Sequence, residues 1–218
     1  MKKDTGSTSL TGKAYETLKD MIVRGQLAQG EVLSMVSLAS QLGLSRTPLT
    51  IACQKLENDG FVRIIPKKGV IVSVLTVDDA REMYELRMAI EGFSAKKSFE
   101  RITPADIDLL KKSFKKQKEF VKVHDVYNFL KEDTEFHMQI LKKYDNRLFV
   151  NSFNNLRDRV FLFGLKVCSS QSRLDGCIVE HTAMIQHLEN GEKNEFISAL
   201  EENIMNGYIQ LTGSYRLG

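Results

Sequence analysis

The stretch Leu-Ala-Ser-Gln-Leu-Gly-Leu-Ser-Arg-Thr-Pro-Leu, residues 38–49, decides the fold of the N-terminal third of the chain. Gly43 is placed to end one short helix, and Ser45 is placed to cap the next one with its hydroxyl. Pro48 then falls in the first turn of that next helix, where its missing N–H leaves no hydrogen bond unmade. The stretch therefore predicts two helices separated by a tight turn.

The flanking sequence extends these two helices into a winged helix-turn-helix. Upstream, Ala14, Leu18 and Ile22 recur at helical spacing and predict a first helix. Downstream, Gly60 is expected to end the third helix, and two short apolar runs then flank Pro66-Lys-Lys-Gly69. This arrangement predicts a hairpin with two lysines at its tip.

In a winged helix-turn-helix the third helix enters the major groove of double-stranded DNA with its N-terminal residues facing the bases. An arginine there can pair with guanine or a phosphate, and hydroxyls can bond phosphates. The hairpin tip is expected to meet the DNA backbone or the minor groove. The predicted DNA-binding residues are Ser45, Arg46, Thr47, Lys67, Lys68 and Gly69. The alternative is that they are ordinary surface residues of a small helical domain.

Composition is that of an ordinary globular protein, but the charge is unevenly distributed. The 218 residues are 42% hydrophobic and 27% charged, with a formal net charge of +3. Residues 1–75 have a net charge of +4, whereas residues 76–218 have a net charge of −1. A small basic domain joined to a larger near-neutral one is typical of a nucleic-acid-binding protein with a separate sensing domain. We expect a flexible tail over 1–9, a DNA-binding domain over 10–75 and an effector-binding and dimerisation domain over 76–218.

Cysteine content and hydropathy predict the compartment. The three cysteines include no CxxC pair, which favours a reducing environment over a disulfide framework. The first ten residues lack the apolar stretch of a signal peptide, and no segment approaches the ~18 apolar residues of a membrane span. We therefore expect a cytoplasmic protein without membrane contact.

Residues 76–218 predict helices throughout. Thr76 with Asp79, and Thr103 with Asp106, form capping-box signals at two helix starts. Apolar residues then recur every three or four positions, which predicts an antiparallel bundle. The expected helices span about 76–100, 104–120, 125–143, 146–169, 174–190 and 193–213. The fold class is mainly α, with an N-terminal winged helix-turn-helix and a C-terminal all-helical bundle.

Polar residues interrupt the apolar stripes of this bundle. Asp133 and His137 share one stripe, His181 lies on another, and Asn203 lies on the inner face of the last helix. Burying each without a partner would cost about 1–3 kcal/mol, so the four are expected to satisfy one another around a metal or a water cluster. Zinc, nickel or manganese would accept two imidazoles and a carboxylate. The alternative for each histidine is an ordinary, hydrogen-bonded core residue.

Arg87 places a guanidinium on the stripe formed with Met83 and Ile90. A buried arginine needs an anion, and the carboxylate of a bound organic acid would satisfy it bidentately. Arg87 is therefore a candidate effector-binding residue. The alternative partner is Glu91, four positions further along the same helix.

The N-terminal region resembles the DNA-binding domain of GntR-family transcriptional regulators. The resemblance rests on residues 30–49, Leu56-Glu-Asn-Asp-Gly-Phe-Val62 and Pro66-Lys-Lys-Gly69, with Leu44-Ser-Arg-Thr-Pro48 its most specific part. The family's recognition helix usually continues as Val-Arg-Glu-Ala, whereas this chain has Leu49-Thr-Ile-Ala52, and Val36 replaces an arginine found in some members. The resemblance implies a homodimer that binds a pseudo-palindromic operator in double-stranded DNA.

The helical region resembles the FCD domain, the effector domain of one GntR subfamily. The matching segments are Glu85-Leu-Arg87 with Glu91, Asp133-Thr-Glu-Phe-His137 with Asn146, and Glu180-His181. Metal-binding members carry a further histidine 22 residues after this last one, where this chain has Asn203, a weaker ligand. The resemblance implies a regulator, most commonly a repressor, that responds to a small organic acid and is not an enzyme.

Two other classes remain open at this point. A DNA-binding dimer with a purely structural bundle would need no metal or effector. A metal-dependent hydrolase would use Asp133, His137 and His181 to activate water, but no distinctive base or nucleophile accompanies them in the sequence.

Overall fold

The computed structural model describes residues 9–215, and the chain divides into two compact units, residues 1–75 and 76–218. The tail predicted over residues 1–9 lies outside the described residues except for Ser9, whose hydroxyl caps the first helix by accepting a hydrogen bond from Gly12 N at 3.1 Å. Among residues 9–215, no helix is both long and apolar enough to cross a membrane.

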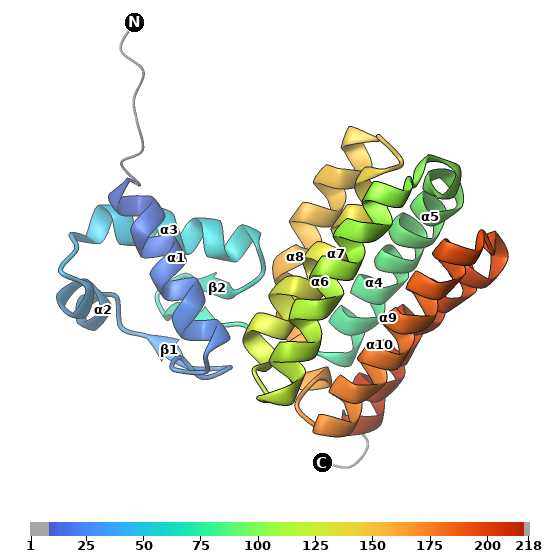
Figure 1. Cartoon of the computed structure of the whole chain (residues 1–218). Coiled ribbons are helices and arrows are strands. Elements are labelled where there is room, and N and C mark those ends of the chain that lie inside the picture. The colour runs from blue at the N-terminus through green and yellow to red at the C-terminus, as the bar shows by residue number, and fades with distance from the viewer. Residues whose placement is uncertain (1–8, 216–218) are drawn as a thin grey trace, which may run out of the picture. The chain divides into compact units, whose positions relative to one another are not determined.

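The first unit combines three helices with a small antiparallel sheet (Figure 1). Its elements are α1 (Leu10–Val23), β1 (Val32–Leu33), α2 (Met35–Leu42), α3 (Arg46–Asn58), β2 (Val62–Ile65) and β3 (Gly69–Val72). The strand order is β1-β3-β2, so β3 is central. Leu18, Leu49 and Phe61 are almost completely buried and join α1, α3 and the sheet in one core. The winged helix-turn-helix is confirmed, and β1 is an addition that the sequence did not predict.

The turn between α2 and α3 differs from its prediction in one detail. Gly43 ends α2 in the left-handed conformation with φ of 62°, as expected. Ser45 occupies the N-cap of α3, but its hydroxyl makes no cap hydrogen bond within the described residues. The predicted capping by this hydroxyl is therefore wrong.

The second unit is an all-helical bundle. It contains α4 (Val77–Arg87), the π-helical turn η1 (Met88–Gly92), α5 (Phe93–Ser98), the 3-10 turn η2 (Phe99–Arg101), α6 (Pro104–Lys122), α7 (Val126–Lys142), α8 (Arg147–Val167), α9 (Gln171–Asn190) and α10 (Lys193–Tyr215). Helix α7 packs against α5, α6 and α8, while α9 packs against α6 and α10 (Figure 1). Phe129, Phe136, Phe153 and Phe163 fill the interior.

The helix starts in this unit follow the sequence signals closely. Both capping boxes form: Thr76 accepts from Asp79 N, and Thr103 accepts from Asp106 N, with each aspartate bonding back to the cap backbone. The helix predicted over 76–100 is divided, because the π-helical turn η1 inserts one wider turn between α4 and α5. This turn carries Glu91, which is a central residue of the buried site.

Candidate functional site

The residues predicted to bind DNA lie on the surface of the first unit. Ser45, Arg46 and Thr47 are exposed at the start of α3, and Thr50 Oγ1 donates to Arg46 O at 2.9 Å. Because the cap hydroxyl of Ser45 is not used within the described helix end, it is available to a phosphate. The start of α3 therefore presents hydroxyls and one guanidinium to a ligand.

The hairpin between β2 and β3 presents the two predicted lysines. Lys68 N donates to Ile65 O at 3.0 Å and closes the turn, which leaves Lys67 with a φ of 66°. A left-handed conformation costs a residue with a Cβ about 1 kcal/mol. Lys67 and Lys68 are both exposed. Gly69 follows with a φ of 102°. The turn thus holds two cations at its tip.

A second polar site lies inside the helical unit, where Asp133 and His137 of α7 meet His181 of α9. One ligand atom from each lies within 4.8 Å of the others. His137 and His181 are 2% and 0% exposed, and the Asp133 side chain is 15% exposed. The structure therefore brings together three of the four predicted metal ligands.

His137 is oriented by a buried chain of charged groups. Its Nδ1 lies 2.7 Å from Glu91 Oε2, and Arg87 Nε donates to Glu91 Oε1 at 2.6 Å. Burial raises the pKa of Glu91, but the charge of Arg87 and the contact with His137 outweigh burial and hold this pKa at about 2. Glu91 is therefore a charged carboxylate that lies between the guanidinium of Arg87 and Nδ1 of His137.

His181 is oriented in the same way by an uncharged partner. Its Nδ1 lies 2.6 Å from Gln117 Oε1 of α6, an atom that can only accept, so Nδ1 carries the proton. Burial lowers the pKa of His181 well below its usual value, which keeps the ring neutral. The ring of Phe136 stacks on it with centroids 4.5 Å apart. The bare Nε2 of His181 is thereby directed to Asp133 Oδ1, at 3.4 Å.

The donor set fits a divalent cation. Nε2 of His137 and Nε2 of His181 are both buried and have no hydrogen-bond partner among the described residues. Burial raises the pKa of the neighbouring Asp133, so this carboxylate lacks the solvation that would stabilise its charge. Two imidazole nitrogens without a protein partner, each on a ring whose other nitrogen contacts a polar side chain, are the usual arrangement of histidine metal ligands.

Asn203, the fourth predicted ligand, is engaged elsewhere. Its Nδ2 donates to Glu180 Oε2 at 2.6 Å. Glu180 also accepts from Asn206 at 2.9 Å and from both terminal nitrogens of Arg173, at 2.8 and 3.0 Å. The side-chain amide of Asn203 is therefore held by this carboxylate, although Asn203 lines the same cavity as Asp133.

That cavity has a volume of about 40 Å³, enough for a few water molecules. Its polar lining residues include Arg87, Asp133, Arg173 and Asn203, and the buried thiols of Cys168 and Cys177 also reach it. Arg173 Nε is buried with no hydrogen-bond partner in the part of the chain that the structure describes. Arg87 Nε, in contrast, is committed to Glu91, as the alternative interpretation of the sequence anticipated. An anion in the cavity would find one unpartnered donor on Arg173 Nε.

The predictions from the sequence did not include Gln117 or Arg173, and they gave Glu180 only as part of a matching segment, without a role. The signal for Gln117 was present, because it interrupts the buried stripe of Leu110 and Val121 as Asp133 and His137 interrupt theirs. Arg173 and Glu180 are seven residues apart, two turns along α9, which also indicated a shared face. The spacing of residues within one helix could not predict the contacts of α9 with α6 and α10.

A basic winged helix-turn-helix joined to a helical domain with a buried polar cavity defines a two-domain DNA-binding regulator. The chain belongs to the gntR family of bacterial regulatory proteins, whose pattern matches residues 10–72, and its helical unit is an FCD domain, matched over residues 82–205. This family consists of transcriptional regulators and not of enzymes.

Named relatives agree with this assignment. The gluconate operon transcriptional repressor of Bacillus subtilis is 28% identical over 199 residues, which cover 87% of this chain and 79% of that protein. A helix-turn-helix regulator of Agrobacterium vitis, from the TAR-I ttuE-ttuC' intergenic region, is 38% identical over 89 residues, 41% of this chain and 52% of that protein. A crystal structure of a GntR regulator from Rhodococcus sp. RHA1 superposes with a TM-score of 0.81 at 21% identity, covering 96% of this chain and 100% of that one. This last likeness concerns the fold alone.

Proposed function

We propose that this protein is a transcriptional repressor whose affinity for its operator is controlled by a small organic acid bound in the helical unit beside Asp133, His137 and His181, where the cavity of about 40 Å³ would widen to admit it. The observation that carries the proposal is a set of three unpartnered polar atoms buried in the helical unit, two in the cluster of Asp133, His137 and His181 and one on Arg173, which lines the cavity. They are Nε2 of His137, Nε2 of His181 and Nε of Arg173, counted among the described side chains. Each buried polar atom without a partner destabilises the protein by about 1–3 kcal/mol. A ligand that forms hydrogen bonds or coordinate bonds with these atoms removes this penalty, which favours its binding.

The two imidazoles and Asp133 would hold a divalent cation such as zinc, nickel or manganese, with Asn203 as a weak additional ligand. The bound cation would supply a Lewis acid that attracts a carboxylate oxygen. Arg173 would then receive the other oxygen through its free Nε, held in place by its bidentate pair with Glu180. Arg87 lines the same cavity and would add positive charge.

Recognition of DNA is assigned to the start of α3 and to the hairpin tip. Arg46 would contact a guanine or a phosphate, and Ser45 and Thr47 would contact phosphates. Lys67, Lys68 and Gly69 would approach the adjacent backbone or minor groove. The uncharged Thr50 stands where many family members have a second arginine, so the preferred operator sequence would differ from theirs.

A homodimer would place two α3 helices on a pseudo-palindromic operator. The acid would change the affinity for DNA only as far as it binds the DNA-competent and DNA-incompetent states of the dimer differently. Release from DNA is the expected direction, and the repressor name of the Bacillus subtilis relative supports it.

The proposal is tested with chelator-treated protein, to which zinc and a panel of short-chain carboxylic acids are added in a melting-temperature screen. We expect an acid-dependent rise in melting temperature that is larger with zinc. Arg173→Gln should weaken binding of the responding acid at least tenfold, because it removes a charged hydrogen bond. Arg157→Gln, at an exposed arginine of α8, serves as the matched control.

Equal acid affinity in the Arg173→Gln and wild-type proteins would contradict the role of Arg173. If no acid shifts the melting temperature with or without zinc, the sensing function itself is wrong, and the bundle is structural.

A further inference from the structure

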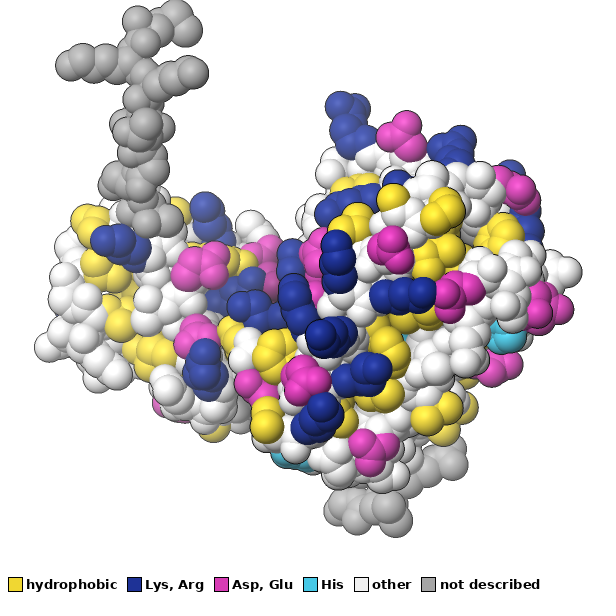
Figure 2. Space-filling model, viewed as in Figure 1, with side chains coloured by type: hydrophobic (Ala, Val, Ile, Leu, Met, Phe, Trp, Pro, Cys, Tyr) yellow, Lys and Arg dark blue, Asp and Glu magenta, His cyan; other side chains and the backbone are white. Residues whose placement is uncertain are grey.

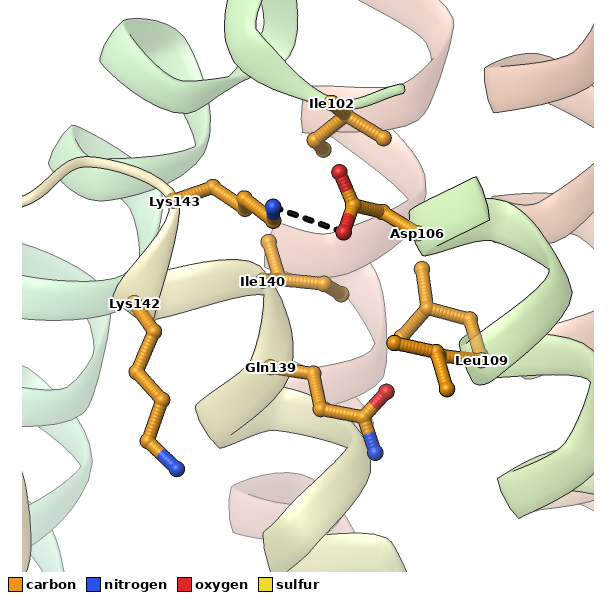
Figure 3. Close-up of a pocket in the computed structure, with 8 residues that line it drawn as sticks. Ile102, Asp106, Leu109, Gln139, Ile140, Lys142 and Lys143 are labelled. Carbon is orange, nitrogen blue, oxygen red and sulfur yellow. Dashed lines mark ion pairs between the residues drawn. The ribbon is translucent and has the colours of Figure 1, made fainter. Parts of the chain in front are cut away.

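Two of the cavities in the helical unit differ in what they offer a ligand. The cavity between α6 and α7 (Figure 3) is mainly apolar, and the charges at its rim neutralise each other, since Lys143 Nζ lies 2.6 Å from Asp106 Oδ1. The cavity of about 40 Å³ beside Asp133 has two thiols in its wall, those of Cys168 and Cys177. Neither thiol takes part in the acid-binding site proposed above.

The two thiols meet where α8 is joined to α9. Cys168 is the C-cap residue of α8, and Cys177 lies in the second turn of α9. The two side chains are hydrogen-bonded to each other, and this bond together with burial raises the pKa of Cys177 well above its usual value. Each residue is only 4% exposed and lines the cavity. The sulfur atoms are therefore open to a small ion in the cavity, and both are thiols in its absence.

Arg173 completes the surroundings of the two thiols. It lies one turn before Cys177 on α9, close enough for its charge to act on both sulfurs. Its two terminal nitrogens are held by Glu180, whereas its Nε is buried and has no partner in the part of the chain that the structure describes. The side chain is 9% exposed and lines the same cavity. A thiolate accepts a hydrogen bond from such an N–H more strongly than a neutral thiol does.

The ligand set selects the class of cation. Thiolates are soft ligands and favour soft cations such as Cu(I). Among residues 9–215, the one group of three or more His, Cys, Asp or Glu side chains with ligand atoms in reach of one another is Asp133, His137 and His181. The thiol pair therefore lacks the further protein ligands of a structural zinc site. Cu(I), in contrast, accepts two thiolates as a complete ligand set.

We propose that Cys168 and Cys177 bind one Cu(I) ion as a two-coordinate bis-thiolate, with Nε of Arg173 donating a hydrogen bond to one of the sulfurs. Both thiols lose their proton to solvent, two S–Cu bonds form, and the copper remains Cu(I), so the step needs no oxidant or reductant. The bis-thiolate has one net negative charge, which the guanidinium of Arg173 stabilises. A single ion fits a cavity that holds a few water molecules.

The test uses the full-length protein, reduced and then freed of reductant under nitrogen, with Cu(I) supplied as its bicinchoninate complex. We expect the wild type to withdraw one Cu(I) per chain, with release of the two thiol protons. Cys168→Ser and Cys177→Ser should each lose this equivalent. Cys53→Ser, at the buried cysteine of the first unit, should retain it. Arg173→Gln should weaken the affinity about tenfold, because it removes a hydrogen bond to a charged sulfur.

X-ray absorption at the copper edge of the wild-type complex tests the ligand set even if a serine variant fails to fold. Sulfur neighbours without nitrogen neighbours are expected. No withdrawal of Cu(I), an equivalent that persists in both Cys168→Ser and Cys177→Ser, or nitrogen ligands on the copper would each overturn the proposal. The titration contains no zinc and none of the acids of the melting-temperature screen, so its outcome is independent of the outcome of that screen.

Discussion

At the scale of single residues, Glu91 links the two polar features of the helical unit. Its two carboxylate oxygens face Arg87 and His137, and all three side chains are more than nine-tenths buried. The sequence predicted Arg87 as an effector ligand, with Glu91 as the alternative partner of its guanidinium. In the structure Arg87 contacts Glu91, and Glu91 contacts His137 of the Asp133, His137 and His181 cluster. Charge compensation by Glu91 is what permits a guanidinium to be buried at this position.

Replacing Glu91 tests this compensation. Glu91→Gln should destabilise the helical unit by about 3–5 kcal/mol, because it leaves the guanidinium of Arg87 buried without a counter-charge. The free energy of unfolding, measured by urea titration in the presence of a chelator, checks this.

The control is the double variant Arg87→Met with Glu91→Leu, which replaces the ion pair by apolar side chains of similar volume. It should recover most of the lost stability, since no buried charge is left unpaired. A double variant as unstable as Glu91→Gln would mean that Glu91 acts mainly through His137.

How much of this site was predictable differs from residue to residue. Asp133, His137 and His181 stand out in the sequence because each interrupts an apolar stripe, and the structure brings them together. Gln117 and His181 are 64 residues apart, so their hydrogen bond follows only from the packing of α6 against α9. Periodicity identifies the buried face of a helix but not the residue that it meets.

At the scale of elements, local signals set the starts of the helices. Thr76 and Thr103 make the predicted capping boxes, and Gly43 makes the predicted helix end. Strand β1 escaped prediction because two residues, Val32 and Leu33, show no alternation to detect. The turn η1 escaped it as well, since residues 76–100 were interpreted with a single α-helical period throughout.

Two helix starts with different caps should respond differently to the loss of a hydroxyl. Thr76→Ala should cost about 1 kcal/mol of stability, because Asp79 N loses its acceptor at the start of α4. Ser45→Ala should change stability by less than about 0.5 kcal/mol, since its hydroxyl makes no cap bond in the described helix start.

The readout that separates the two variants is DNA binding. Ser45→Ala should weaken operator affinity, and Thr76→Ala should leave it unchanged, in gel-shift titrations at fixed salt. A stability loss in Ser45→Ala as large as that in Thr76→Ala would show that the serine hydroxyl does cap α3.

At the scale of the whole molecule, each unit has its own core. Leu18, Leu49 and Phe61 belong to the first, and Phe136 and Phe163 belong to the second. The net positive charge of residues 1–75 agrees with DNA binding by the first unit. Figure 2 shows Lys and Arg side chains on the helical unit as well, so charge alone does not locate the DNA-binding surface.

Separate cores predict separable functions. Residues 76–218 expressed alone should fold, shown by helical circular dichroism and a cooperative thermal transition, and should bind the same acids as the full chain. Operator binding should be lost, because α3 and the hairpin are absent. A fragment that fails to fold, or that folds but binds no acid recognised by the full chain, would show that the helical unit depends on the DNA-binding unit.

The wide turn η1 has a mechanical consequence. Residues 77–98 form one continuous rod in which Met88–Gly92 are wound more loosely than the helices on either side. If that turn adopted ordinary α-helical winding, the helix on one side of it would rotate about the helix axis relative to the other side. The rotation would be that of one residue, about 100°. Such a twist would swing Arg87 away from Glu91 and turn the end of the rod at Thr76, the residue that follows the DNA-binding unit directly. The buried carboxylate of Glu91 lies on this wider turn, so a change in its winding would alter the Arg87–Glu91 pair and the orientation of the helix start together.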